Sequence, residues 1–369
     1  MSQLFSPITL RDMTVSNRLV VSPMCQYLSQ DGNAEDWHLM HLGQMAMGAG
    51  GLLFTEATHV SPEGRITPRC LGLWSDDNER TLKRVVDFCK THGVAKMGIQ
   101  LAHAGRKASN RPPLQGAGPL AANENPWQTL GPSEVPYGDW PAPRALDDDG
   151  LAAVKAQFVE ATERSARIGF DVVEVHAAHG YLLHQFLSPL SNVRNDRYGG
   201  SIEGRMQFPL EVFDACRAVW PETKPMGVRV SATDWVDDGL SVDEVVEFCK
   251  ALKEHGCDFI DVSSGGNHPG QKITLGPGYQ VPFAERVKRE VGIPVMAVGL
   301  ITEPAQAESI VASGQADFVA LARGVMDNPR WAWHAARALG AQTDYPAQYV
   351  RCRPDTWRAA PAVMAPAAE

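Results

Sequence analysis

The segment from Val172 to Tyr181 joins a run of β-branched residues to two histidines and a tyrosine. His176 and His179 offer N–H groups that can hold one substrate oxygen, and Tyr181 carries a phenol whose ordinary pKa is about 10. This pattern predicts proton transfer beside a bound oxygen at the end of a strand. Two alternatives stay open here, a metal site on the paired histidines and a structural role for half-buried polar rings.

The elements that position these residues follow a repeating unit, in which an amphipathic helix ends at a glycine and a short apolar strand begins directly after it. One helix is expected to start at Ser241, with Glu244 three residues later as in a capping box, and to end at Gly256. Other helices of this kind end at Gly93, at Gly169 and, for one that begins at Thr302, at Gly314.

Apolar strands that alternate with helices indicate a parallel sheet covered by helices. About eight strands can be counted, which is the number that closes a (β/α)8 barrel. An open doubly wound sheet competes, but no Gly-x-Gly-x-x-Gly follows the first strand. The fold class is therefore α/β, with strands expected at 19–21, 52–55, 97–101, 170–175, 226–230, 259–263, 295–298 and 318–322.

We expect residues 1–340 to form a single barrel with an N-terminal cap. Residues 341–369 are expected to form a C-terminal tail, partly ordered at a subunit interface and disordered at its end. The stretch 110–144 is rich in proline and glycine and contains Trp127 and Trp140. It is predicted to be a long loop after the third strand, and such loops are commonly lids or binding loops.

Composition narrows the class of protein. The 369 residues are 44% hydrophobic and 21% charged, as in globular proteins. No apolar run approaches the roughly 20 residues of a membrane span, and the first residues lack the pattern of a signal peptide, so we expect no membrane partner and a cytoplasmic location. A net charge of −9 without a basic stripe argues against nucleic acid. Seven cysteines without a Cys-x-x-Cys pair favour free thiols.

Reactive side chains of a (β/α)8 barrel gather at the carboxyl ends of its strands. Arg229 is expected inside the barrel, where its permanent charge needs an anionic partner, either an electron-rich cofactor or an interior carboxylate such as Glu174 or Glu56. The loops after strands seven and eight are the usual phosphate site of this fold. The candidates in chain order are Ser22, Pro23, Met24, Cys25, Tyr27, Glu56, Ala57, Gln100, His103, His176, His179, Tyr181, Arg229, Gly299, Ala322 and Arg323.

The chain resembles the Old Yellow Enzyme family of flavin-dependent ene-reductases over almost its whole length. Cys25, Tyr27 and His179 are similar to the thermophilic-like subgroup that includes xenobiotic reductase A. The motifs that carry the family resemblance are Asn17-Arg18, Pro23-Met24, Gln100-Leu-x-His103-x-Gly-Arg106, Glu174-x-His176, Gly180-Tyr181, Ser191-Asn-x-Arg194 and Tyr198-Gly-Gly-Ser201.

The resemblance implies a non-covalently bound FMN and no metal. Gln100 would bond the pyrimidine edge and Arg229 would face N1 and the C2 carbonyl. Cys25 would lie beside N5 and O4 and tune the potential without a covalent intermediate. The full set implied to bind FMN is Ser22, Pro23, Met24, Cys25, Ala57, Gln100, Arg229, Gly299, Ala322 and Arg323, of which the last two and Gly299 would hold the phosphate.

The resemblance also implies the reaction. NAD(P)H would reduce FMN, and hydride would then pass from N5 to the β-carbon of an activated alkene, an α,β-unsaturated carbonyl or nitro compound. His176 and His179 would hold the carbonyl or nitro oxygen, as oxyanion donors do. Tyr27 would line the substrate side, and Tyr181 would protonate the α-carbon.

The C-terminal tail bears on the oligomeric state. In the subgroup an arginine from this region reaches into a neighbouring subunit's site, which for Arg351 implies a substrate contact in a homodimer or a dimer of dimers. The tail continues past Arg351, so Arg353 or Trp357 are alternatives for that place.

Two rival functions are kept. A metal-dependent barrel hydrolase would use His103, His176 and His179 together with further ligands converging on one ion. A barrel that binds a ligand without catalysis is the other.

Overall fold

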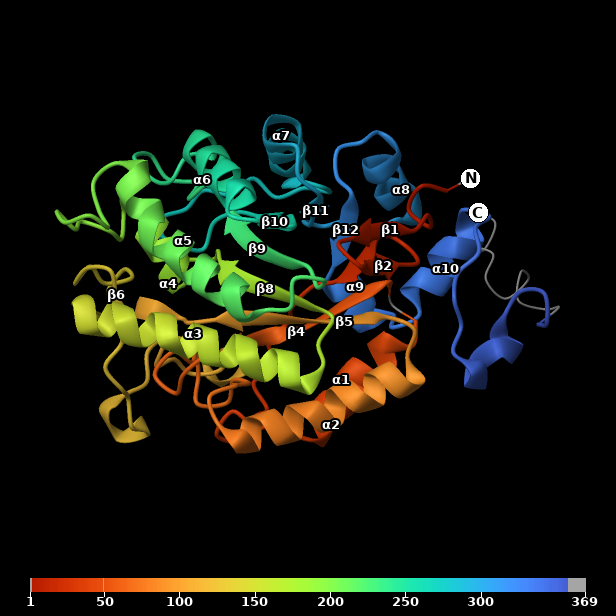
Figure 1. Ribbon diagram of the computed structural model, residues 1–369, viewed down its shortest axis with the longest axis horizontal. Coiled ribbons are helices and arrows are strands. Elements are labelled where there is room, and N and C mark those ends of the chain that lie inside the picture. Colours follow the sequence, from red (N-terminus) through yellow and green to blue (C-terminus); the bar gives the residue numbers. More distant parts are fainter. Residues whose placement is uncertain (1, 49, 358–369) are drawn as a thin grey trace.

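The computed structural model describes residues 2–48 and 50–357, which contain a closed barrel of eight parallel strands surrounded by helices (Figure 1). The ring closes where β12 pairs with β3. The (β/α)8 prediction is therefore confirmed. The barrel strands are β3 (Leu19–Val21), β4 (Leu52–His59), β5 (Lys96–Ala102), β8 (Val172–Ala177), β9 (Met226–Ser231), β10 (Phe259–Ser263), β11 (Val295–Ala297) and β12 (Phe318–Leu321).

The second strand is longer than predicted. It continues past Thr55 to His59, and its pairing with β5 is irregular between Phe54 and Ala57. Glu56 and Ala57 therefore lie within β4, beside this irregularity, and not after its end. The sequence alone did not reveal this, because Glu56, Thr58 and His59 are polar residues of the kind that often ends a strand, yet all three are buried in the structure.

The helices cover the outside of the barrel, and their ends follow the signals in the sequence. The Ser241 side chain accepts the N–H of Glu244, as in a capping box, and Gly169 ends α3 with a left-handed φ of 97°. The helix expected from Thr302 starts two residues later. The main helices are α1 (Asp36–Ala46), α2 (Asp76–His92), α3 (Asp148–Ile168), α5 (Ile202–Val219), α6 (Val242–Glu254), α7 (Val281–Val291), α8 (Pro304–Ala312) and α10 (Trp331–Ala338), with the shorter α4 (Leu182–Leu187) and α9 (Arg323–Asp327).

Apolar side chains fill the barrel at the amino ends of its strands. Phe54 and Phe259 face each other there, with ring centroids 6.4 Å apart. Glycine makes room for both rings, since a Cβ at Gly98 would lie 2.6 Å from Phe54 and one at Gly227 would lie 2.4 Å from Phe259. The antiparallel hairpin of β1 (Ile8–Leu10) and β2 (Met13–Val15) packs on the same cluster and is the predicted N-terminal cap.

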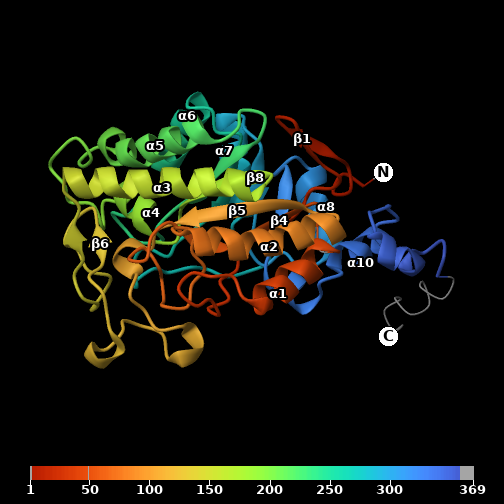
Figure 2. The same ribbon diagram turned by 60° about the horizontal axis from the view of Figure 1, so that its bottom comes forward.

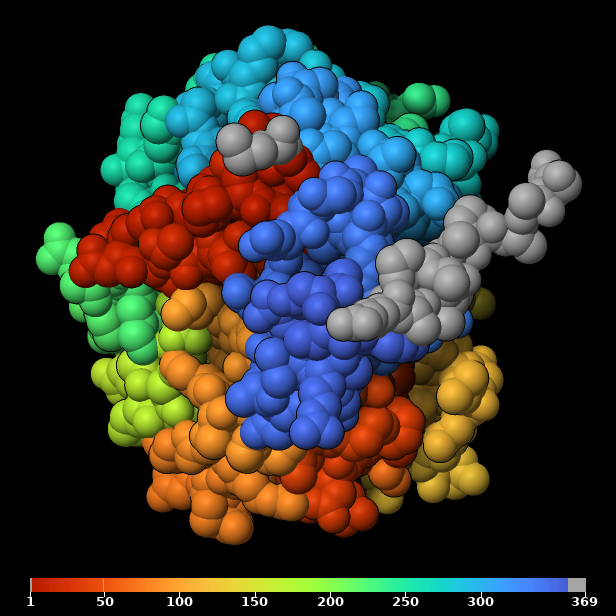
Figure 3. All heavy atoms as spheres, turned by 90° about the vertical axis from the view of Figure 1, so that its right-hand side faces the viewer, coloured from red at the N-terminus to blue at the C-terminus, as the bar shows by residue number. Residues whose placement is uncertain are grey.

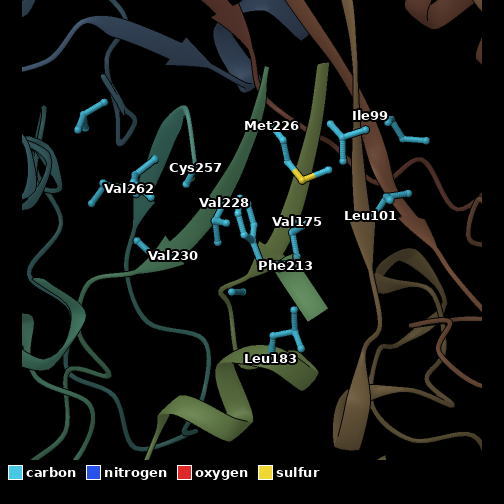
Figure 4. Close-up of a cluster of buried hydrophobic side chains, with 14 of the residues drawn as sticks. Ile99, Leu101, Val175, Leu183, Phe213, Met226, Val228, Val230, Cys257 and Val262 are labelled. Atoms are coloured by element: carbon cyan, nitrogen blue, oxygen red, sulfur yellow. The ribbon is translucent and has the colours of Figure 1, made fainter. Parts of the chain in front are cut away.

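A second apolar layer lies between the strands and the helices. Figure 4 shows Val175 of β8 and Val228 of β9 beside Phe213 of α5, with Leu183 of α4 on the same side. All four are at most 1% exposed. Alternate residues of these strands therefore pack outward against helices, and the others point into the barrel.

The predicted long loop after the third barrel strand is confirmed. Figure 2 shows β5 pointing toward this loop, which contains β6 (Leu130–Gly131) and the short 3-10 turns η2 (Pro113–Gln115) and η3 (Ala122–Glu124) before β7 (Arg144–Ala145). Arg106 links the loop to the barrel, because its Nη1 donates to the carbonyls of Val135 and Pro136 at 3.2 Å and its Nη2 donates to that of Asn267 at 2.7 Å. The role as a lid stays a prediction.

The tail follows α10 and contains η4 (Ala347–Cys352). It lies on the face of the molecule where the N-terminal hairpin also lies (Figure 3). Tyr345 stacks on Trp333 with ring centroids 4.4 Å apart, and Arg337 lies 5.7 Å from the Trp357 ring. The disorder expected at the end falls on residues 358–369, outside the described part, and the division at residue 340 stays a prediction.

No helix in the described ranges is both long enough and apolar enough to cross a bilayer.

The apolar barrel interior generates the first prediction. Phe259→Ala should lower the free energy of unfolding by about 3 to 5 kcal/mol, because it leaves a cavity that neighbouring strands cannot close. Chemical denaturation of the two proteins measures the difference. Leu114→Ala is the matched control, since Leu114 is fully exposed in the long loop and should change stability by less than about 0.5 kcal/mol. Equal effects would show that the Phe259 ring does not stabilise the barrel.

Candidate active site

A cavity of about 500 Å3 opens at the carboxyl ends of β9 to β12. It brings together predicted residues from four segments that are far apart in the sequence. Residues of the loop after β10 also line this cavity. The lining includes His179, Arg229, Ser263, Ser264, Tyr279, Gln280, Gly299, Ala322 and Arg323.

Charged and polar side chains form a layer inside the barrel, above the apolar cluster. Gln100 of β5 donates from Nε2 to Glu174 Oε1 of β8 at 2.7 Å. Arg229 of β9 has its Nε 3.2 Å from Asp261 Oδ2 of β10. The strand register sets this order, because Gln100 pairs with Glu174 and Arg229 pairs with Asp261. Four neighbouring strands therefore present one guanidinium, one amide and two carboxyl groups to the same space.

This layer is buried, and burial changes the pKa values of its carboxyl groups. Glu174 and Asp261 are at most 1% exposed and Arg229 is 6% exposed. Burial, and then the charge of Asp261, raise the pKa of Glu174, while Arg229 and Gln100 act in the opposite direction. Burial also raises the pKa of Asp261. One fixed cation does not balance two buried anions, so the layer favours a protonated carboxyl.

The partner of Arg229 differs from the carboxylates considered in the sequence. An interior ion pair is present, but with Asp261. Glu56 instead lies 3.2 Å from His38 Nε2 and accepts the N–H of Gln26 at 3.2 Å. A signal for Asp261 was present, since it shares one face of β10 with Phe259 and Ser263 and is a carboxylate in the middle of an apolar strand.

The two histidines and Tyr181 gather as predicted. The His176 ring is 5.1 Å from the rings of both His179 and Tyr181, edge to face in each case. Burial, followed by the charge of Arg229, lowers the pKa of both histidines well below the usual value, so both are neutral near pH 7. His176 Nδ1 accepts the N–H of Ala178 at 3.2 Å, which leaves the proton of the neutral ring on Nε2.

His179 has a different neighbour, the Ser263 hydroxyl, which lies 2.9 Å from its Nε2. Ser263 Oγ also lies 3.0 Å from the Val230 carbonyl, and the hydroxyl has one proton to donate. When that proton goes to His179, the neutral ring keeps its own proton on Nδ1 and can donate it. Ser263 therefore influences the tautomer of His179. It was not among the predicted site residues.

Cys25, Tyr27 and Tyr181 lie together on one wall. They pack with Trp127 against a small buried cluster formed by Ile66, Cys70, Ala104 and Ala108. Burial is the main cause that raises the pKa of Cys25, Tyr27 and Tyr181 above their usual values, and for Cys25 the Glu56 carboxylate adds to it. The thiol and both phenols are therefore protonated at neutral pH.

The remaining predicted contacts lie around this wall and the cavity. Ser22 and Ala57 are buried, and Pro23 is half-buried. Met24 packs on the main core. Gly299 has a φ of 124°, where a side chain would be strained, and a Cβ there would lie 3.0 Å from Gln280 Nε2. Bare backbone therefore faces the cavity.

Ala322 and Arg323 lie at the start of α9, on the cavity side. Arg323 is exposed and forms no ion pair with any residue of the described ranges. A free cation beside bare backbone suits a phosphate.

Two predicted residues do not join this site within the chain. Arg351 is exposed in η4 and does not line the cavity. The tail that contains η4 lies beside the N-terminal hairpin, away from the long-loop end of the barrel (Figures 1 and 3). His103 is buried, its Nδ1 accepts the N–H of Gly105 at 3.0 Å, and it does not line the cavity. Among residues 2–48 and 50–357, no group of three or more His, Cys, Asp or Glu side chains is placed to hold a metal ion.

Lys107 is absent from the residues predicted above, yet it borders the site. Its Nζ donates to the carbonyl of His179 at 2.8 Å and lies 5.2 Å from the centre of the Tyr181 ring. It directly follows Arg106 of the Gln100 motif, so its position in the sequence was the available signal.

The residues present fit a flavin mononucleotide. Ser22 Oγ, Glu174 Oε2 and Asp261 Oδ1 are buried without a hydrogen-bond partner in the described part of the chain. Gln100 uses Nε2 for Glu174, which leaves Oε1 to accept from a ligand N–H. The layer thus offers an amide and a cation to an electron-rich ring, and the cavity adds a cation and backbone suited to a phosphate.

Fold and site together define a flavin-binding oxidoreductase barrel. The chain matches the model of the NADH:flavin oxidoreductase / NADH oxidase family over residues 3–342, and it belongs to this family, the Old Yellow Enzyme family. The expectations of an FMN cofactor, of NAD(P)H as reductant and of an NAD(P)H-dependent flavin oxidoreductase are thereby confirmed.

Comparison with individual known proteins supports this family membership. The chain is 46% identical over 351 residues to an NADPH dehydrogenase of Geobacillus thermodenitrificans, across 94% of this chain and 98% of the relative. It is 41% identical over 352 residues to an NADPH dehydrogenase of Bacillus subtilis, across 95% and 98%. Among solved structures it is similar to morphinone reductase, with a TM-score of 0.76 and 28% identity over 94% of this chain and 91% of that one.

The buried carboxyl layer generates the second prediction. A carboxyl whose pKa is raised by folding keeps its proton after the unfolded chain has lost it, so the folded state binds more protons and stability falls as pH rises above the ordinary value of about 4.3. Glu174→Gln should therefore make the free energy of unfolding decline less between about pH 5 and about pH 8 than in the wild type. Denaturation at both pH values measures this slope.

Glu211→Gln is the control, because Glu211 is a half-buried carboxylate on the barrel's outer surface that pairs with Lys155. It should not flatten the slope. An unchanged slope in Glu174→Gln would show that Glu174 ionises normally.

Proposed function

We propose that this flavin oxidoreductase is an ene-reductase, which reduces activated alkenes such as α,β-unsaturated carbonyl and nitro compounds. The observation that carries the proposal is the cluster of two neutral histidines and a protonated tyrosine, with ring centroids 5.1 Å apart, at the edge of the flavin-binding cavity. Neutral donors suit an oxygen that gains negative charge, and a phenol suits the delivery of a proton. One similar solved structure is named morphinone reductase, which agrees with this class.

When bound, FMN would supply hydride transfer from NAD(P)H to the alkene. Arg229 would provide a fixed positive charge to hold the ring, and Gln100 would hold its polar edge. Cys25 stays a thiol because burial and Glu56 disfavour the thiolate, so it acts as a neutral neighbour of the ring. Backbone at Gly299 and Ala322, with Arg323, would hold the phosphate.

The substrate is oriented by the protein's donors. His176 donates from Nε2 to the carbonyl or nitro oxygen, and His179 donates from Nδ1 when the Ser263 hydroxyl donates its proton to His179 Nε2. Tyr27 lines the same side, beside Cys25. The oxygen then receives hydrogen bonds while negative charge builds on it, and loss of one such donor costs about 100- to 1,000-fold in rate.

Tyr181 delivers the proton to the α-carbon. Its ring packs against the wall that also carries Cys25 and Tyr27, and burial keeps its hydroxyl protonated. Such a donor is worth about 100- to 10,000-fold in rate.

Tyr181→Phe tests this assignment. Anaerobic stopped-flow absorbance would follow flavin reduction by NADPH and, separately, reoxidation by 2-cyclohexenone. We expect the first rate to stay within about twofold, since it needs no phenol, and the second to fall at least about 100-fold. Phe208, a buried core residue beside Phe186, offers Phe208→Leu as a control for general loss of packing, which should not separate the two rates.

An unchanged alkene rate in Tyr181→Phe would remove Tyr181 from its role. Purified wild-type protein that contains no flavin, or that is reduced by NADPH but transfers nothing to any activated alkene, would contradict the ene-reductase proposal itself. The latter result would favour a barrel that binds ligands without this reaction.

We also propose that the tail completes the site of a neighbouring subunit in a homodimer or a dimer of dimers. Arg351 is exposed and does not line the cavity of its own chain, so a second copy would have to bring it to a substrate. Arg351→Ala should raise the KM for 2-cyclohexenone by about 3- to 10-fold with little change in flavin reduction, as expected for one lost hydrogen bond. Steady-state kinetics measure this, and Arg353→Ala is the matched variant.

A cytoplasmic location agrees with the cysteines. All seven lie within the described residues and all are free. Free thiols persist in reducing compartments.

A further inference from the structure

We propose that Lys107 is the positioning residue of the proton-transfer step: its ammonium group links the loop that carries His179 to the loop after β10, and it stabilises the negative charge that develops on Tyr181. The inference rests on the proposed ene-reductase reaction. It concerns a residue that neither the family resemblance nor the predicted site includes.

Lys107 reaches the site from the 3-10 turn η1 (Gly105–Lys107), directly after β5. Its Nζ donates to the carbonyls of His179 and Gly266, each at 2.8 Å. These acceptors are 72 and 159 residues away in the sequence. One ammonium therefore joins three separate segments at the edge of the cavity.

The two acceptor loops turn sharply and touch each other where Lys107 binds them. His179 has a φ of 58° and Gly266 a φ of 96°, both in the left-handed region. The loops also touch, because a Cβ at Gly180 would lie 2.2 Å from the Gly266 carbonyl oxygen. A cation between their carbonyls forms charge-assisted hydrogen bonds, which are stronger than neutral ones. Lys107 thereby helps to fix the turn that places His179 and Tyr181.

The same ammonium lies beside the phenol. Nζ is 5.2 Å from the centre of the Tyr181 ring and 4.9 Å from that of Tyr137, which comes from the long loop. The other influences on Tyr181 act against ionisation, since burial and the nearby Cys25, Tyr27, Cys70 and Tyr137 all raise its pKa. A phenol in that setting gives up its proton more readily when a cation is close, because the cation stabilises the phenolate.

This stabilisation depends on pH. Burial, followed by the charge of Arg106, lowers the pKa of Lys107 to about 7. The titratable groups that face the ammonium are Arg106 on its own turn, His176 and His179 from the β8 end, Tyr181 at the start of α4, and Tyr137 from the long loop. No carboxylate in the described part of the chain forms an ion pair with Lys107. The ammonium is thus present below about pH 7 and is lost as pH rises above it, so the alkene step should slow over that range.

Two substitutions separate charge from shape. Lys107→Met removes the cation and keeps an unbranched chain, and it should slow alkene reduction at about pH 6 by about 10- to 100-fold, because the developing phenolate loses its nearby positive charge. Lys107→Arg keeps a charge at every accessible pH, so its alkene step should no longer slow above about pH 7. Lys83→Met, at an exposed lysine paired with Asp87, is the control.

The experiment is single-turnover reoxidation of NADPH-reduced holoenzyme by 2-cyclohexenone, from about pH 6 to about pH 9, in H2O and in D2O. We expect flavin reduction by NADPH to change less than about threefold in Lys107→Met. The solvent isotope effect on its alkene step should rise, because proton transfer becomes the slower part. FMN absorbance and the thermal midpoint show whether each variant is folded.

The outcomes distinguish this inference from the proposed function. If Tyr181→Phe slows the alkene step while Lys107→Met keeps the wild-type rate and pH profile, Lys107 has no such role and the ene-reductase assignment stands. If Lys107→Met fails to fold, the pH profile of Lys107→Arg decides, and a profile that still falls above about pH 7 overturns the inference. If the wild type reduces no alkene, the proposed function fails first.

Discussion

A guanidinium buried inside the barrel sets the conditions for the rest of the site. A guanidinium keeps its charge in proteins, so the strands beside Arg229, which is only 6% exposed, must supply anions to it. Asp261 provides one anion, with its Oδ2 3.2 Å from Arg229 Nε. Glu174 adds a second carboxyl one strand away. Burial raises the pKa of both carboxyls, and for Glu174 the charge of Asp261 adds to it, so the layer favours a protonated carboxyl and presents its cation to the space above. A ring that gains electrons suits that position.

This charged layer can exist because an apolar layer below it is closed and well packed. Phe54 and Phe259 fill the barrel where Gly98 and Gly227 leave space for their rings, and the N-terminal hairpin covers that end. Close packing of this apolar layer helps to keep the strand register fixed. Because the register is fixed, Gln100, Glu174, Arg229 and Asp261 meet side by side, and the residues after them emerge together at the carboxyl ends.

Around the cavity, burial also decides the protonation states of the histidines and of Tyr181. Burial keeps His176 and His179 neutral and Tyr181 protonated, so the site contains donors without formal charge. Neutral donors can follow a change of charge on a bound oxygen with little reorganisation. A positive charge that can titrate near pH 7 lies on Lys107, whose ammonium group two loop carbonyls hold beside Tyr181. Neutral donors together with the nearby charges of Lys107 and Arg229 suit the cluster to the proposed proton delivery.

The sequence by itself determined the eight strands, the helices that end at glycine, and the residue types that follow each strand, because each of these signals is local and repeats along the chain. It also placed His176, His179 and Tyr181 at the carboxyl end of β8 and Arg229 within β9. It did not determine their partners, nor that β4 extends to His59. Asp261 for Arg229, Ser263 for His179 and the two carbonyls for Lys107 come from segments 32 to 159 residues away. Such pairs exist only once the barrel closes, because its register and twist decide which side chains face each other, and no local pattern encodes that choice.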